Sequence, residues 1–185
     1  MGRREELLEQ AVDYVLTHGL FGLSLRPLAD ALGTSDRMLL YHFKSKDLLV
    51  TEILRVSNER SLARLRDLPA SADVRTGVLD LWQAISTQPV LSCVRLYIEA
   101  SALGLFGSEP YASSQRATNE EWIRALEDHL VEAGLPREAA PRVVVLVDAS
   151  FQGFVLDFPL EEDPAERRQA IEDLAVAARV VAASS

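Results

Sequence analysis

Two short helical segments separated by three small residues constrain the fold of this chain more than any other feature of its sequence. The first segment starts after Ser24, a helix N-cap residue type, and its apolar residues recur at helical spacing until Gly33. Gly33 tolerates a positive φ, and Ser35 can cap a second helix that starts at a large angle to the first. The pattern therefore predicts two short helices that end near Leu32 and Phe43 and are joined by a tight turn.

The second of these helices presents two chemically different faces. At about 100° per residue, its apolar side chains cluster on one side and are expected in the core: Leu39, Leu40 and Phe43. Arg37, Met38 and Tyr41 share the other side. Arginine can bind a guanine edge through two hydrogen bonds, methionine can touch a thymine methyl group, and tyrosine can hydrogen-bond phosphate or base. This face has the chemistry of a helix that reads DNA.

The stretch from Leu23 to Leu49, LSLRPLADALGTSDRMLLYHFKSKDLL, resembles the N-terminal helix-turn-helix of TetR-type transcriptional repressors. The residues that match the family pattern in register are Ser24, Leu28-Ala29, Gly33, Ser35, His42-Phe43, Lys46-Asp47 and Leu49. Leu40 stands where the family usually has a tyrosine, and Tyr41 follows one residue later. The resemblance is confined to the N-terminal part of the chain and implies a DNA-binding domain over residues 1–50.

Nine residues of this stretch are expected to contact DNA: Ser24, Pro27, Thr34, Ser35, Arg37, Met38, Tyr41, His42 and Lys46. Lys46 opens the next helix, where free backbone N–H groups and the helix dipole favour a phosphate. His42 has an alternative role, because a histidine at this position could instead cap the end of its helix.

The remainder of the chain also reads as helix interrupted by proline and glycine, without the alternation typical of strands. One helix is expected before the DNA-binding stretch and six after it: 4–18, 46–67, 74–87, 89–105, 111–133, 136–158 and 164–183. The predicted fold class is therefore all-α, with an N-terminal three-helix domain followed by a larger helical bundle over residues 51–185.

In TetR-type proteins the C-terminal helical domain binds a small effector, which changes the spacing of the two DNA-reading heads and releases DNA. The resemblance implies the same role for residues 51–185, where apolar residues of successive helices could surround a pocket for a mainly apolar small molecule. The candidate ligand contacts are Trp82, Cys93, Tyr97, Glu99, Phe106, Trp122, Leu126, Phe151 and Gln152, with Asp148 as a further polar candidate. The alternative is that these aromatic residues are ordinary core.

The resemblance also implies that the last two long helices pair with those of a second subunit. The final helix starts with a cap at Asp163 and a proline in its first position, and its apolar residues follow a three-four spacing. We expect a homodimer with a symmetric, hydrophobic four-helix interface built from Val147, Phe154, Phe158, Ile171, Leu174, Ala178 and Val181. The alternative is that the final helix packs this stripe of residues against its own domain.

The charge balance limits the kinds of partner. The 185 residues carry a net charge of −9 at pH 7, which argues against a protein that coats nucleic acid without specificity. Residues 1–50 carry six basic and seven acidic side chains, so affinity for DNA must come from a few well-placed cations, doubled by dimerisation. We therefore expect the partner to be a palindromic operator in double-stranded DNA.

Several other classes are disfavoured. The single Cys93 excludes an intramolecular disulfide and a thiolate metal cluster, and the three histidines lie too far apart in sequence to suggest zinc, so no metal or cofactor is expected. No glycine-rich phosphate loop, nucleophile elbow or zinc-protease motif is present, which argues against an enzyme. No apolar run approaches a bilayer span and no signal-peptide pattern is present, so we expect no membrane association and a cytoplasmic location. The alternative function is a helical protein-interaction module that does not bind DNA.

Overall fold

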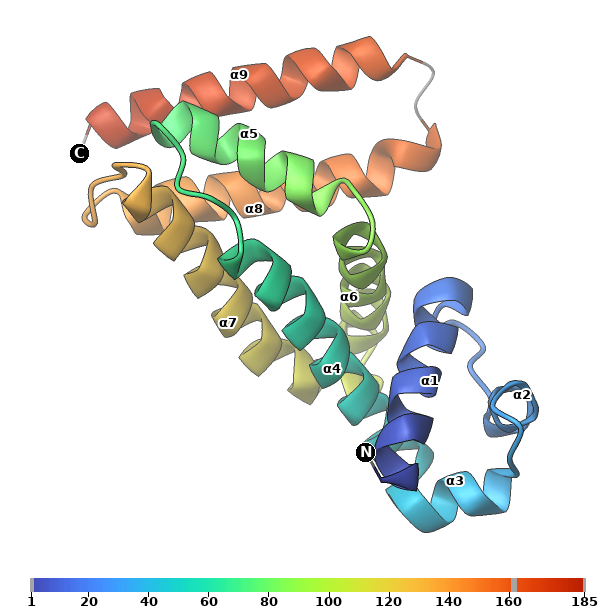
Figure 1. Cartoon of the computed structure of the whole chain (residues 1–185). Helices are drawn as coiled ribbons and strands as arrows, with labels where there is room; N and C mark the ends of the chain where they lie inside the picture. Colours follow the sequence, from blue (N-terminus) through green and yellow to red (C-terminus); the bar gives the residue numbers. More distant parts are fainter. Residues whose placement is uncertain (1, 161–162, 185) are drawn as a thin grey trace. The chain divides into compact units, whose positions relative to one another are not determined.

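The computed structural model describes residues 2–160 and 163–184, apart from the side chains of residues 113–115, 117 and 158. Within these ranges the chain forms nine α-helices, one 3-10 turn and no strand (Figure 1). The elements are α1 (Arg3–His18), α2 (Leu25–Ala31), α3 (Asp36–Phe43), α4 (Lys46–Arg66), α5 (Val74–Ile85), α6 (Val90–Leu105), α7 (Tyr111–Glu132), α8 (Ala140–Asp157), η1 (Phe158–Leu160) and α9 (Pro164–Ala183). The predicted all-α fold class is confirmed.

Local sequence signals explain several helix starts. Asp73 and Asp163 cap α5 and α9, where their carboxylates accept hydrogen bonds from the N–H groups of Thr76 and Ala165. Helix α8 starts at Ala140 rather than at the predicted Pro136. The chain first makes a separate turn there, closed by the N–H of Ala139 donating to the carbonyl oxygen of Pro136 at 3.0 Å.

The chain divides into two compact units that do not coincide with the predicted domains. The first unit comprises Met1–Arg60 and Arg95–Asn119, and the second comprises Ser61–Val94 and Glu120–Ser185. Helices α4, α6 and α7 each contribute residues to both units. The N-terminal helices therefore share a compact unit with most of α6, a segment that we expected in the larger domain. Compactness does not test where a DNA-binding domain ends, so the functional boundary at residue 50 stays a prediction.

The core of the first unit is formed by the apolar faces of α1 to α4 together with residues of α6 and α7. Its buried members include Leu7, Leu8, Ala11, Val12, Val15, Leu20, Leu28, Ala29, Leu39, Phe43, Leu49, Ile53, Leu96, Ala100 and Tyr111. The prediction that Leu40 lies in this core is wrong, because that side chain is exposed. Leu40 lies about 80° around α3 from the direction shared by Leu39 and Phe43, so it sits at the edge of the buried face.

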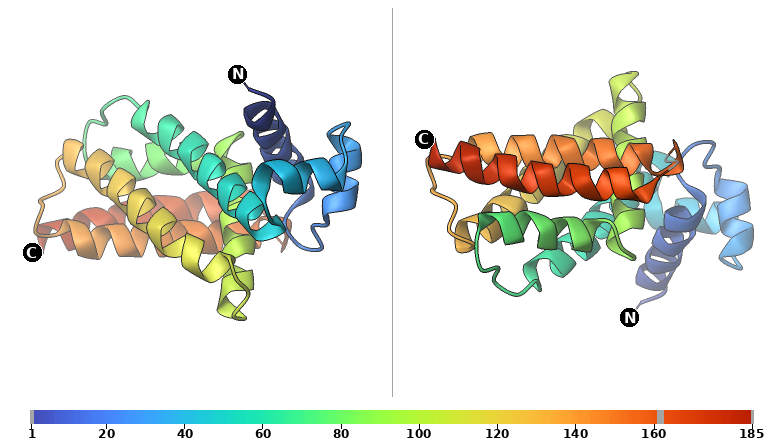
Figure 2. Two further views of the ribbon diagram at one scale, coloured as in Figure 1. Left: turned by 90° about the horizontal axis from the view of Figure 1, so that it is seen from below. Right: turned by 90° about the horizontal axis from the view of Figure 1, so that it is seen from above.

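The second unit is a helical bundle in which α9 packs on both α5 and α8 (Figure 2). Gly77 allows α5 to approach α7 closely, because a Cβ atom there would lie only 3.1 Å from the side chains of Leu130 and Ala133. The valine-rich run at the start of α8 is helical, as predicted, and buries Val143, Val144 and Val147. In the described ranges, no helix combines the length and apolar character needed to cross a bilayer.

Candidate functional site

The turn between α2 and α3 is built by short-range hydrogen bonds. Gly33 adopts a positive φ of 63°, and the N–H of Thr34 donates to the carbonyl oxygen of Ala29 at 2.9 Å. At the start of α3, the side chain of Ser35 accepts a hydrogen bond from the N–H of Met38 at 3.2 Å. These bonds fix the direction in which α3 leaves the turn, as the sequence predicted. Ser35 is committed to this cap, whereas Ser24 makes no side-chain cap bond at the start of α2.

Helix α3 buries one face and exposes the other. Leu39 and Phe43 are fully enclosed, whereas Met38 is 42% exposed, Tyr41 is 67% exposed and Arg37 is exposed as well. Among the described residues, the guanidinium group of Arg37 has no hydrogen-bond or ion-pair partner, so its donors are available to a ligand. We use the name DNA-reading face for Arg37, Met38 and Tyr41, whose contact with DNA stays a prediction.

Lys44 is not one of the nine contacts named from the sequence, although it belongs to the Lys44-Ser45-Lys46 run that was expected at a phosphate. It ends α3 with a positive φ of 69°, which is uncommon for a residue with a side chain. Its Nζ donates to the carbonyl oxygen of Tyr41 at 3.2 Å and lies 5.7 Å from the centre of the Tyr41 ring. This conformation holds a cation beside the DNA-reading face. The basic Lys44-Ser45-Lys46 run was the only sequence signal for it.

Lys46 has an intramolecular partner that sequence reasoning did not anticipate. Its Nζ donates to the carbonyl oxygen of Leu23 in the connection between α1 and α2. A lysine ammonium has three donors, so two can still bind a phosphate. The predicted phosphate contact is therefore compatible with this geometry, but Lys46 also positions the chain that leads into α2.

Arg4 connects α1 to the end of α3 and was also missed from the sequence. Its guanidinium group pairs with Glu52, donates from Nε to the carbonyl oxygen of His42 at 3.4 Å, and lies 4.9 Å from the ring centre of Phe43. These partners are about forty or more residues away along the chain. A contact of this separation leaves no local pattern in the sequence that could reveal it.

Glu99 has a different partner from the predicted ligand. Its carboxylate accepts a hydrogen bond from the N–H of Leu20 at 2.6 Å, just after α1. Gly19 precedes this contact with a φ of 81°, and a Cβ atom there would lie 2.9 Å from both carboxylate oxygens. Glu99 therefore holds the end of α1 against α6, both within the first compact unit.

The nine predicted ligand contacts are divided between the two compact units. Tyr97, Glu99 and Phe106 belong to the first unit, and the other six, Trp82, Cys93, Trp122, Leu126, Phe151 and Gln152, belong to the second. Phe106 is 88% exposed in the turn after α6, so it lines no enclosed core. The hydroxyl of Tyr97 donates to the side-chain oxygen of Asn119 at 3.0 Å.

Within the second unit, several of these residues lie close together. The ring centroid of Trp82 is 5.3 Å from that of Phe151 and 5.7 Å from that of Phe154. Cys93, Leu126 and Phe151 are buried, which fits an ordinary core as well as a ligand pocket. Their role in ligand binding stays a prediction.

Asp148 is the centre of a polar cluster within this apolar unit. Its carboxylate accepts hydrogen bonds from Nε1 of Trp122 and Nε2 of Gln152, each at 2.8 Å. Burial raises the pKa of Asp148, against the opposing effect of these two hydrogen bonds. The three polar groups satisfy one another, so the cluster stabilises the packing of α7 on α8.

Most of the residues predicted for the dimer interface are buried within the chain itself. Val147, Ile171, Leu174 and Ala178 are buried in the second unit, Phe154 and Val181 are partly buried, and the side chain of Phe158 lies outside the described residues. The stripe on α9 packs on α5 and α8 of the same chain, which was the alternative interpretation of the sequence.

A second apolar surface lies on the opposite faces of α8 and α9. Its exposed residues are Val145, Leu146, Ala149, Leu156, Val176, Ala177 and Val180. They recur three, four or seven residues apart on each helix, so they form one continuous stripe per helix. We call this surface the outer α8–α9 face. The sequence could not distinguish it from the buried stripe, because both are apolar.

The N-terminal region matches a known family. Residues 7–53 match the family model described as bacterial regulatory proteins of the tetR family. Over 70 residues the chain is 39% identical to the HTH-type transcriptional repressor KstR2 of Rhodococcus jostii, a match that covers 38% of this chain and 34% of that repressor. The matched segment thus spans about a third of the length of this curated relative.

Solved structures extend the likeness of fold to nearly the whole chain. A transcriptional regulator from Rhodococcus sp. RHA1 aligns with a TM-score of 0.77 at 21% identity over 95% of each chain. The multidrug binding protein EbrR, complexed with proflavin, aligns with a TM-score of 0.65 at 25% identity over 94% of this chain and 98% of its own. Residues 7–53 therefore match the helix-turn-helix domain of the tetR family, and the described residues share the overall fold of solved transcriptional regulators.

Proposed function

We propose that this chain is a transcriptional repressor that binds a palindromic operator as a homodimer and is released by a small, mainly apolar effector. It would act in the cytoplasm, where its operator would lie. The observation that carries the proposal is the exposed DNA-reading face on a short helix whose start is capped by Ser35 and whose other face is buried. Such a helix can enter the major groove and place three different side chains against base edges.

The charge distribution supports a specific rather than a general mode of DNA binding. A chain with a net charge of −9 repels bulk phosphate, so its contacts must be few and well placed. Arg37, Lys44 and the two remaining donors of Lys46 would supply these contacts on α3 and at the start of α4. The alternative of a pure protein-interaction module does not explain an arginine without a partner beside a capped turn.

The outer α8–α9 face supports the homodimer. An apolar stripe on each of two adjacent helices is costly to leave in water and is suited to a symmetric contact with the same two helices of a second copy. Ala149 and Ala177 lie on the stripes, and a Cβ atom added at Gly153 would meet no other atom within 4 Å. Small residues at these positions allow the helices of two subunits to approach closely. In a dimer of this kind the two recognition helices would reach half-sites about one DNA turn apart, roughly 34 Å.

A mobility-shift assay with the DNA that flanks the chain's own gene tests the proposal. We expect a dimer-sized complex that survives excess non-specific DNA and whose affinity falls steeply with salt. Methylation or base substitution at symmetric positions should map two equal half-sites. Binding that is equally strong to any DNA, or absent at low salt, would contradict a specific operator and favour the protein-interaction alternative.

A further inference from the structure

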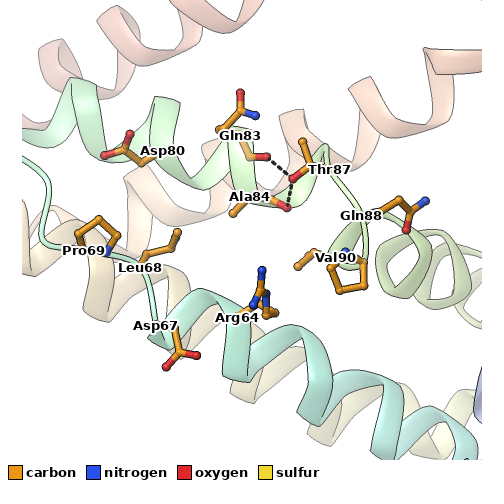
Figure 3. A pocket seen from close by; sticks show the side chains of 11 residues that line it. Arg64, Asp67, Leu68, Pro69, Asp80, Gln83, Ala84, Thr87, Gln88 and Val90 are labelled. Carbon is orange, nitrogen blue, oxygen red and sulfur yellow. Dashed lines mark hydrogen bonds between the residues drawn. The ribbon is translucent and has the colours of Figure 1, made fainter.

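An open cleft of about 370 Å³ lies in the second unit between the end of α4, α5 and the connection to α6 (Figure 3). It is lined by Arg64, Asp67, Leu68, Pro69, Asp80, Gln83, Ala84, Thr87, Gln88, Pro89 and Val90. None of these residues belongs to the ligand contacts predicted from the sequence. The volume is within the range of small-molecule sites, which usually combine an apolar lining with a few polar groups.

The lining of this cleft combines an apolar surface with a few polar groups. Leu68 in the connection after α4, Ala84 on α5 and Val90 at the start of α6 supply the apolar surface. The side-chain oxygen of Gln88 accepts a hydrogen bond from the hydroxyl of Ser92 on α6 at 2.9 Å, and Figure 3 shows this amide pointing away from Arg64. The hydroxyl hydrogen of Thr87 is shared with the carbonyl oxygens of Gln83 and Ala84, at 2.9 and 3.4 Å.

Arg64 is the cation of the cleft. Figure 3 shows its side chain pointing from α4 toward α5, whereas the carboxylate of Asp67 points away. In the described part of the chain, Arg64 and Asp67 take part in no ion pair, with each other or with other residues. The second carboxylate, that of Asp80, accepts a hydrogen bond from Ser71 in the connection between α4 and α5, at 2.6 Å. The guanidinium group is therefore free to bind an anion.

We propose that this cleft binds a small organic carboxylate. The carboxylate would form a bidentate pair with Arg64, while its hydrocarbon part rests on Leu68, Ala84 and Val90. A phosphate dianion fits less well, because only one cation lines the cleft and two carboxylates lie on its margin. That such a carboxylate acts as the effector rests on the function proposed above. That the cleft binds a carboxylate does not depend on that function.

Titration calorimetry on the full chain without DNA tests the inference. The probes are phenylacetate, 3-phenylpropionate and decanoate, with 2-phenylethanol as the neutral control and inorganic phosphate as the anion without a hydrocarbon part. We expect saturable binding of one carboxylate per chain, at least tenfold tighter than either control. Because a bidentate charged pair is lost, Arg64→Gln should weaken this binding about tenfold or more.

Arg66→Gln is the matched control, because Arg66 lies in the same last turn of α4 but lines a different cleft, with Asp128 and Glu132. It should change carboxylate affinity by less than twofold. Ala84→Leu should also weaken binding by narrowing the cleft, with circular dichroism to confirm that the helices are intact. The inference is overturned if no probe carboxylate saturates the chain, or if Arg64→Gln and Arg66→Gln have the same effect.

Operator binding measured on the same samples separates this inference from the proposed function. If the chain binds a carboxylate through Arg64 but binds no operator, the cleft is supported and the regulatory function is wrong. If it binds the operator but none of the carboxylates, the regulatory function is supported and the cleft inference is wrong. If both occur and the carboxylate lowers operator affinity, the operator must weaken carboxylate binding by the same factor.

Discussion

Helices α3 and α9 show opposite relations between sequence pattern and surface. In α3 the apolar residues lie mainly on one side and the chemically active residues on the other, so one face is buried and one is exposed. In α9 two apolar stripes lie on opposite sides, and only one of them, with Ile171, Leu174 and Ala178, is buried in the chain. The difference teaches that an apolar stripe identifies an interface but not the partner that covers it.

The comparison also separates two kinds of functional surface. The DNA-reading face of α3 is chemically distinctive, because it combines a cation, a thioether and a phenol. The outer α8–α9 face has no such signature, and it differs from the core in being exposed among the described residues of the chain. Five changes to single residues would break or sharpen this contrast.

Leu174→Arg should have the largest effect. Leu174 is 8% exposed in the packing of α9 within the second unit, so the change would bury an unpaired charge and cost about 3–5 kcal/mol of the free energy of unfolding. Chemical denaturation followed by circular dichroism would measure the loss. A stably folded monomer would instead show that this residue lies at the dimer interface, as the sequence first suggested.

Val180→Arg should leave the fold intact but disrupt the dimer. Val180 is 55% exposed on the outer α8–α9 face, so an arginine there is solvated in the monomer. Only in the dimer would it lie against the apolar face of the partner subunit and near the same arginine of that subunit. We expect the dimer dissociation constant to rise at least a hundredfold, about 2.7 kcal/mol. Sedimentation velocity would measure it, with Arg179→Lys as a control that keeps the charge of a neighbouring exposed position. An unchanged dimer would place the interface elsewhere.

Arg37→Ala should weaken operator binding by about 1–3 kcal/mol and relax the sequence preference at one base pair of each half-site. Lys46→Ala should weaken binding to all sequences and reduce its salt dependence, because Lys46 is expected to contact phosphate and also holds the carbonyl of Leu23. Fluorescence anisotropy with operator and base-substituted duplexes would distinguish the two. Equal loss of specificity in both variants would contradict the assigned DNA-reading face.

Asp148→Asn should have the smallest effect, visible as a change in pH dependence. Because burial raises the folded-state pKa of Asp148 above its unfolded value, its contribution to stability is present at low pH and is lost as pH rises through the folded pKa. Asparagine cannot ionise but can still accept from Trp122. The stability of the variant relative to the parent should therefore increase from acid to neutral pH, as measured by urea denaturation at several pH values. A constant difference would show that ionisation of Asp148 is not involved.

The sequence by itself determined the helices and the exposure of one face of α3, because both depend on contacts within a few residues. Spacing and capping residues predicted every helix closely except for the start of α8, and the turn at Gly33 has the expected positive φ. The exposed positions of Arg37, Met38 and Tyr41 follow from helical periodicity once Leu39 and Phe43 are assigned to the core. A few dihedral angles and one buried face are enough to define this region.

Only the tertiary structure decided which helices pack together and which residues are left without a partner. The bond from Glu99 to Leu20, and those from Arg4 to Glu52 and His42, join residues far apart in sequence, so no local pattern indicates them. The same holds for Arg64, which looks like any solvated helical arginine until α5 is placed opposite it. On α9, both stripes satisfy helical periodicity equally well, because hydrophobic burial is non-directional and does not specify which neighbour will cover an apolar surface.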